Sequence, residues 1–215
     1  MHMKYADVTR LVGRLRCFDL ALLVQAFPDK RPAIRLQLSR WIAQGKVIAL
    51  RRGLYTLPDD ARRISLDPAL LAQEIFRPSF LSGLWALALY DLIPEKVVTY
   101  TSVTTRLPAR FTNAYGVFEY RHLKSEAFFG SQQVAYGTGS LCVARPEKAL
   151  LDHWHLSPGE WTLERLEAMR YQNCDKVDQA RLEESAARFR RPRLMRAAKR
   201  WRQVAQQVDE GTVNL

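Results

Sequence analysis

The sequence of residues 31–56 strongly restricts the structure that this part of the chain can form. Pro32 suits the first turn of a helix, apolar residues recur at helical spacing up to residue 44, and Gly45 suits the position just after a helix end. Two strand-like runs follow, VIAL and LYT, separated by the three residues RRG, in which glycine supplies the permissive backbone of a tight turn. The segment therefore predicts a helix that runs directly into a two-stranded hairpin.

Two shorter helices precede this segment. Apolar spacing predicts one over residues 3–12, a short extended piece RCFD follows, and Asp19 is a suitable N-cap for a second helix over residues 20–27. The order is helix, short strand, helix, turn, helix and hairpin, as in a winged helix-turn-helix domain. The sequence therefore predicts such a domain over residues 1–63.

The third helix has two unlike faces. At about 100° per residue, Ile34, Leu38, Trp41 and Ile42 fall within about one third of the circle and suit a core. The residues on the opposite side or at its margin are Arg35, Leu36, Ser39 and Arg40. A small serine permits close approach to base edges, and each arginine can donate two hydrogen bonds to a guanine or bind a phosphate.

Positive charge is concentrated at the two ends of the sequence. The net charge of +11 divides into +8 for residues 1–63, −3 for residues 64–187 and +6 for residues 188–215. Such segregation is typical of a chain that binds a polyanion; nucleic acid is the first candidate and an anionic membrane surface the second. No segment combines a Trp- or Leu-rich face with a lysine-rich face, as an interfacial helix would.

The helix, the hairpin and the charge together predict an interface for double-stranded DNA. We expect Arg35, Ser39 and Arg40 to contact base edges in the major groove. The residues expected to contact phosphates are Arg31, Lys46, Arg51 and Arg52. The last two are included because a hairpin beside such a helix lies along the DNA backbone. An ordinary solvated turn is the alternative for these two arginines.

Residues 64–215 have the pattern of a mixed α/β domain. The predicted strands are KVVTYTSV, GVFEYRHL, QQVAYGTG and SLCVA. The predicted helices lie at residues 67–76, 82–92, 146–154, 163–171, 177–189 and 192–208. The whole chain is therefore predicted to be an α+β protein, with an N-terminal winged helix-turn-helix domain followed by a mixed α/β domain with a helical C-terminal tail.

The last predicted helix is strongly basic, with eight cations between residues 188 and 202. Leu194, Ala198 and Trp201 form one apolar stripe along it. One interpretation is an amphipathic helix docked on the protein with a solvated outer face, and the other is a second contact with the DNA backbone. The residues of that second contact would be Arg191, Arg193, Arg196 and Arg200.

Five short motifs occur in order between about residue 5 and residue 155: RRGLYTLP, ALALYDLIPE, VTYTSVTTR, YGVFEYRHLK and ARPEKALLD. In this combination they resemble the AbiEi-type antitoxin and transcriptional-regulator family of bacteria, which is associated with abortive infection and type IV toxin-antitoxin systems. The resemblance implies a winged helix domain that binds operator DNA and represses its own operon, and a second domain with antitoxin activity. It also implies that the functional partner is a nucleotidyltransferase-like toxin. The antitoxin would counteract the effect of this toxin without forming a stable complex with it.

The resemblance also assigns motif positions. These are Arg51, Arg52 and Gly53; Thr101, Ser102, Thr104, Thr105 and Arg106; Glu119, Arg121 and His122; and Pro146, Glu147, Lys148 and Asp152. Asp91 stands where the family pattern has glycine, and aspartate still tolerates the left-handed backbone of a helix C-terminus. The basic C-terminus has no counterpart in these motifs.

An enzyme is the main alternative class. A metal-dependent nuclease would need carboxylates that converge on a cation, whereas Glu119 and Arg121 alternate on one strand face and suit an ion pair. His153 and His155 are two residues apart, about 200° around a helix, so they cannot bind one metal ion together. We therefore predict no catalytic residue, no metal site, no cofactor and no enzymatic activity. A plain transcriptional regulator without antitoxin activity is the second alternative.

The sequence also predicts a cytoplasmic protein without a membrane partner. The longest apolar run, at residues 84–90, is about a third of the roughly 20 residues that span a bilayer. The first residues lack the apolar region of a signal peptide. The three cysteines are far apart and odd in number, so the sequence does not indicate a disulfide framework or a zinc site.

Overall fold

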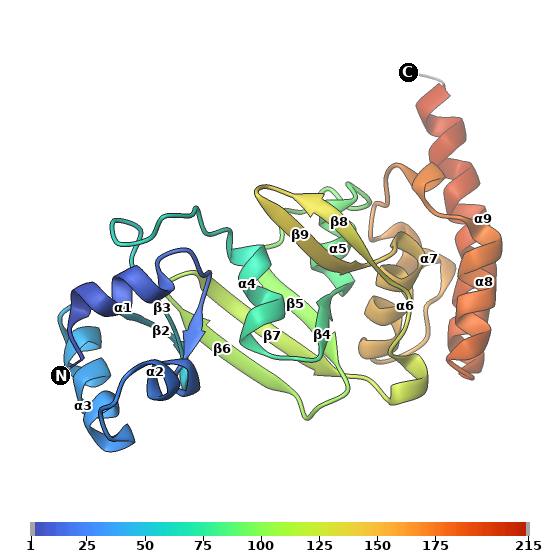
Figure 1. Cartoon of the computed structure of the whole chain (residues 1–215). Coiled ribbons are helices and arrows are strands. Elements are labelled where there is room, and N and C mark those ends of the chain that lie inside the picture. The colour runs from blue at the N-terminus through green and yellow to red at the C-terminus, as the bar shows by residue number, and fades with distance from the viewer. Residues whose placement is uncertain (1–2, 214–215) are drawn as a thin grey trace.

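Three helices and a small antiparallel sheet form the first part of the chain (Figure 1). The computed structural model describes the backbone of residues 3–213 and the side chains of residues 3–208. The first elements are α1 (Tyr5–Val12), β1 (Phe18–Asp19), α2 (Leu20–Ala26), α3 (Arg31–Ala43), β2 (Ile48–Arg51) and β3 (Leu54–Thr56). The strand order is β1-β3-β2. These elements occur in the predicted order and close to the predicted positions.

Local sequence signals explain where these elements begin and end. The Asp19 carboxylate caps α2, because it accepts the N–H of Leu22 at 2.8 Å. Pro32 lies in the first turn of α3. Gly45, just beyond α3, and Gly53, in the hairpin turn, have φ values of 70° and 81°, which other residues adopt only with strain. The cap and both glycine positions are therefore confirmed.

A six-stranded mixed sheet forms the middle of the chain, in the order β6-β7-β5-β4-β9-β8. The strands are β4 (Ser79–Leu81), β5 (Thr99–Thr104), β6 (Ala109–Asn113), β7 (Gly116–His122), β8 (Ser131–Tyr136) and β9 (Gly139–Ala144). The pairs β5–β7 and β4–β9 are parallel, and the other neighbours are antiparallel. Two helices, α4 (Pro68–Ile75) and α5 (Gly83–Leu89), contact this sheet, so the fold is α+β.

Two strands of this sheet were not predicted. β4 has only three residues, too few to show a period, and β6 is an edge strand with a polar sequence whose residues are all at least partly exposed. The predicted helix over residues 82–92 ends earlier, because Asp91 has a positive φ of 56°. A left-handed backbone at Asp91 is what the family resemblance implies for this position.

Helices close the other end of the molecule (Figure 1). They are α6 (Pro146–Leu156), α7 (Leu163–Glu167), α8 (Gln179–Arg188) and α9 (Pro192–Val213). Trp154, Trp161 and Trp201 are all buried, and the Trp154 ring lies 6.1 Å from each of the other two, centroid to centroid. The predicted helix over residues 163–171 is wrong beyond Glu167, because the backbone turns left-handed at Arg170.

The buried apolar side chains of residues 3–208 form two cores, and the segment that contains the β2–β3 hairpin contributes to both. Val47 and Leu57, which flank the hairpin, lie in the smaller core with α1, α2 and α3. Leu50 and Leu54 lie instead in the larger core, which contains the six-stranded sheet and the C-terminal helices. The Asn113 side-chain amide of β6 donates to the Leu50 carbonyl at 3.1 Å. The hairpin therefore joins residues 1–63 to the rest of the chain.

Candidate nucleic-acid interface

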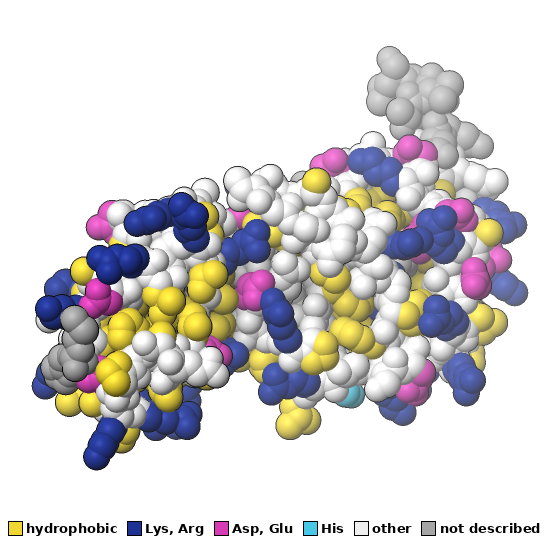
Figure 2. Space-filling model, viewed as in Figure 1, with side chains coloured by type: hydrophobic (Ala, Val, Ile, Leu, Met, Phe, Trp, Pro, Cys, Tyr) yellow, Lys and Arg dark blue, Asp and Glu magenta, His cyan; other side chains and the backbone are white. Residues whose placement is uncertain are grey.

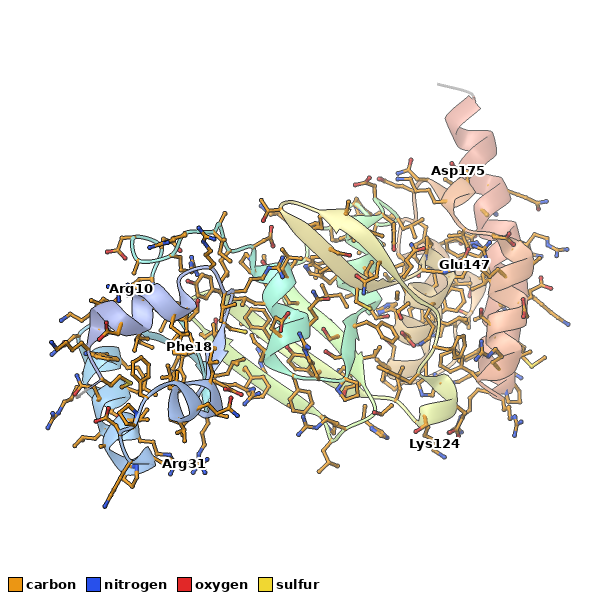
Figure 3. All side chains as sticks on the ribbon, in the orientation of Figure 1. Arg10, Phe18, Arg31, Lys124, Glu147 and Asp175 are labelled. Atoms are coloured by element: carbon orange, nitrogen blue, oxygen red, sulfur yellow. The ribbon has the colours of Figure 1, made fainter. Side chains whose placement is uncertain are left out.

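Helix α3 presents the predicted groove residues to solvent. Ile34, Leu38 and Trp41 are buried in the smaller core, which fixes the rotation of the helix. The exposed residues on its other sides include Arg31, Arg35, Leu36, Ser39, Arg40 and Ile42. Ile42, predicted to face the core, lies at its edge and is 36 % exposed. Arg31 lies at the start of α3, at the lower edge of the first part in Figure 3.

The cations of α3 are available for an external anion. Among the described residues, no carboxylate pairs with Arg31, Arg35 or Arg40. The Ser39 hydroxyl donates to the Arg35 carbonyl at 3.1 Å, which leaves its lone pairs free to accept a further bond. Leu36 is 54 % exposed on the same helix. Such a surface, cationic with a small polar residue and an apolar side chain, can contact phosphates, base edges and a thymine methyl group.

The two hairpin arginines have different environments. Arg52 is exposed, and no described residue bonds to its side chain. Arg51 is partly buried: its Nε donates to the Ile75 carbonyl at the end of α4, and its Nη1 donates to the Arg52 carbonyl at 2.9 Å. The structure thus gives Arg51 an internal role that the sequence did not indicate. Of the two hairpin arginines, only Arg52 has a side chain that is exposed and free of described partners, as a contact with a phosphate would require.

Lys46 lies in a second group of cations. It lines an open cavity of about 760 Å³ together with Arg10 and Arg63, between α1, the end of α3 and the segment that follows β3. A neighbouring cavity of about 650 Å³ is lined by Arg14, Arg16 and Arg63. Sequence reasoning missed Arg10, Arg14, Arg16 and Arg63 as surface neighbours, although the +8 charge of residues 1–63 includes them. Figure 2 shows Lys and Arg side chains gathered around this part of the molecule.

The cations of α9 mostly serve to dock that helix. The Arg193 guanidinium donates to the carbonyls of His155, Ser157 and Gly159, at 2.6 to 2.9 Å. Arg196 and Arg200 both bind the Glu160 carboxylate, at 2.8 to 3.1 Å. Three of the four residues suggested for a second DNA contact are therefore partnered within the protein. Arg191 is exposed, and no described residue bonds to its side chain.

Four of the polar motif residues after residue 63 form ion pairs with one another. Glu119 and Arg121 form the predicted ion pair on β7, at 3.1 Å. Lys148 and Asp152 form a buried ion pair within α6, and the Ser82 hydroxyl donates to Asp152 Oδ2 at 2.6 Å. Over residues 3–208, no group of three or more His, Cys, Asp or Glu side chains is placed to hold a metal ion. No helix within the described part of the chain has the length and apolar character needed to cross a bilayer.

His153 and His155 occupy apolar surroundings on α6. His153 packs against Trp161 and His155 against Phe189, each with ring centroids 5.2 Å apart. Burial lowers the pKa of both imidazoles to about 4. Part of this shift comes from nearby cations, which are Arg165 for His153, and Arg193, Arg191 and Lys148 for His155.

These histidines are expected to make the fold acid-sensitive. Since the unfolded chain binds their protons near pH 6.5 and the folded chain only near pH 4, the free energy of unfolding should be constant above pH 6.5 and fall as the pH drops toward 4. Urea unfolding at pH 7 and pH 5 measures the loss. The variant His153→Gln/His155→Gln should show a smaller difference between the two pH values, and the exposed His122→Gln control should not. Equal losses in both variants would contradict the assignment.

Comparison of the sequence with protein-family models and with curated proteins finds no match in either case.

Proposed function

We propose that the chain is a DNA-binding transcriptional regulator whose first 63 residues bind duplex DNA as a winged helix-turn-helix domain. The exposed, unpaired cationic face of α3 is the observation that carries this proposal. The order of helices and strands and the β1-β3-β2 sheet support it, because they match the layout of that domain class. A 13-residue helix with one face buried and the other basic suits the width of the major groove.

The contacts divide by chemistry. Arg35, Ser39 and Arg40 would contact base edges, since they lie on the exposed side of α3. Arg31, at the start of α3, Arg52, at the hairpin turn, and Lys46 would contact phosphates. Arg51 would act indirectly, by fixing the hairpin turn against the end of α4.

We further propose that the regulator serves as the antitoxin of a type IV toxin-antitoxin system, with a nucleotidyltransferase-like toxin as functional partner. This part rests on the five sequence motifs alone. The gene beside this one tests it: a nucleotidyltransferase-like reading frame whose toxicity is relieved by co-expression of the chain would support it. Failure to relieve that toxicity would favour a plain regulator. Degradation of labelled DNA with added Mg²⁺ would favour a nuclease.

Arg52→Ala is expected to weaken binding to all DNA sequences alike. It removes one phosphate contact, so the slope of log affinity against log salt concentration should fall by about one. Fluorescence anisotropy titrations between low and moderate salt, on operator and unrelated duplexes, measure both effects. Arg110→Ala removes an exposed arginine of β6 and should leave the slope unchanged. Equal slopes for Arg52→Ala and the unaltered chain would remove Arg52 from the interface.

A further inference from the structure

A cavity of about 370 Å³ opens where α6 begins, beside the start of β8 and along α8. It lies at the other end of the molecule from α3, on the side where Figure 3 labels Glu147. The charged side chains that line it are Arg145, Glu147, Lys148, Arg181, Glu184 and Arg188. Cations therefore outnumber carboxylates. The pairing of Lys148 with Asp152 still leaves three guanidinium groups facing two carboxylates.

Two of these guanidinium groups are available to an anion. Arg145 is exposed at the N-cap of α6, and no described residue bonds to its side chain. Arg188 is exposed, its guanidinium carbon lies over the Phe129 ring at 3.7 Å from the centroid, and no described residue donates to or accepts from its side chain. The first turn of α6 adds backbone N–H groups without intrahelical acceptors, together with the positive end of the helix dipole.

Glu147 gives a second, independent indication that a ligand binds in this cavity. Its side chain is only 2 % exposed. One carboxylate oxygen, Oε1, accepts the Asp178 N–H at 3.0 Å and Arg181 Nη1 at 3.3 Å. The other, Oε2, is buried without a hydrogen-bond partner among the described residues. Buried carboxylate oxygens are normally satisfied, so Oε2 is an acceptor that the described residues leave open to a donor from outside the chain.

We propose that this cavity binds a small phosphate ester that also carries hydroxyl groups, of the class of sugar phosphates and nucleotides. The phosphate would lie between Arg145, Arg188 and the first turn of α6, and a hydroxyl group would donate to Glu147 Oε2. A simple anion leaves Oε2 unsatisfied, and a neutral sugar leaves the guanidinium groups unused. Arg145 and Arg188, which pair with no described carboxylate, are two positive groups and favour a dianionic phosphate over the single charge of a carboxylate.

Isothermal titration calorimetry of the full chain tests the proposal with four probes: a ribose phosphate, adenosine monophosphate, inorganic phosphate and adenosine. We expect the two phosphate esters to bind more tightly than inorganic phosphate, and adenosine to bind least. Arg145→Ala should weaken binding of both esters about tenfold, as the loss of one charge-assisted hydrogen bond. Glu147→Gln should reduce the preference for the ribose phosphate over inorganic phosphate, because the amide offers a different donor and acceptor pattern.

Arg110→Ala is the matched control, since it removes an exposed arginine on β6 that does not line the cavity. Thermal unfolding of each variant shows whether it is folded. Arg145→Ala is exposed and should fold normally, so the proposal stays testable if Glu147→Gln does not. Equal affinities for Arg145→Ala and Arg110→Ala, tighter binding of inorganic phosphate than of the esters, or no heat from any probe at millimolar concentration would overturn the proposal.

Discussion

Lys148→Met is expected to lower the free energy of unfolding by about 3–5 kcal/mol. Lys148 and Asp152 are 1 % and 0 % exposed, and the ammonium donates to the Asp152 carboxylate. The rings of Phe80, Phe129 and Phe189 surround the ammonium, with centroids 5.0 to 5.6 Å away. Burial raises the pKa of Asp152 and lowers that of Lys148, so each charge persists only because the other is present. Methionine fills the volume but leaves Asp152 as a buried, unpaired acid.

Urea unfolding of the variant measures this loss directly. Lys148→Met/Asp152→Leu removes both charges and should recover much of the stability, because an apolar pair of similar volume avoids the desolvation of two ions. The Ser82 hydroxyl would then lose its acceptor, so recovery should be incomplete. Lys96→Met, at an exposed lysine, serves as the control. A loss below about 1 kcal/mol for Lys148→Met would mean that the pair contributes no more than an exposed one.

Arg35→Ala/Arg40→Ala is expected to lower the affinity for the preferred DNA sequence by about 100-fold or more. Each arginine placed on a base edge contributes roughly 1–3 kcal/mol of discrimination, and both side chains lie on the exposed face of α3. Affinity for unrelated DNA should fall less, so the variant should lose sequence preference as well as strength. Selection of preferred sequences from a random pool, followed by anisotropy titrations, measures both quantities.

The control for this experiment removes two cations elsewhere. Arg110→Ala/Lys124→Ala changes the net charge by the same amount at exposed positions of the middle domain. It should reduce affinity slightly and leave the preferred sequence unaltered. If both double variants lost the same affinity, the contribution of α3 would be general attraction to a polyanion, and the proposed groove contact would be wrong.

Features set by neighbouring residues were predictable from the sequence. The two faces of α3 follow from helical spacing, and the Asp19 cap follows from its position before an apolar run; the left-handed backbone at Asp91 was implied only by the family resemblance, since helical spacing predicted a helix through residue 92. The elements that carry the proposed interface were all predicted at the correct place in the chain. The exposure of Arg35, Ser39 and Arg40 follows from the same spacing, whereas the exposure of Ile42 and the partial burial of Arg51 do not.

Partners distant in the sequence could not be predicted. Arg51 bonds to the carbonyl of Ile75, and Arg193 bonds to three carbonyls some 34 to 38 residues earlier. The sequence does not indicate which backbone carbonyl will accept a side-chain hydrogen bond, because every residue has a carbonyl group. From the sequence, Arg51 and Arg52 were predicted to make the same kind of DNA contact, and so were Arg191 and Arg193. In the structure, the members of each pair have different environments.

The shared hairpin has a mechanical consequence. Since Leu50 and Leu54 lie in the larger core while Val47 and Leu57 lie in the smaller one, the hairpin is packed against both parts of the molecule and should resist bending between them. In the proposed complex, the orientation of α3 on a duplex would depend on the rest of the chain, because Asn113 and Arg51 bond the hairpin to it. A fragment that ends at residue 63 would lose these contacts and would expose Leu50 and Leu54 to water. A change in the orientation of β6 would therefore change the orientation of α3.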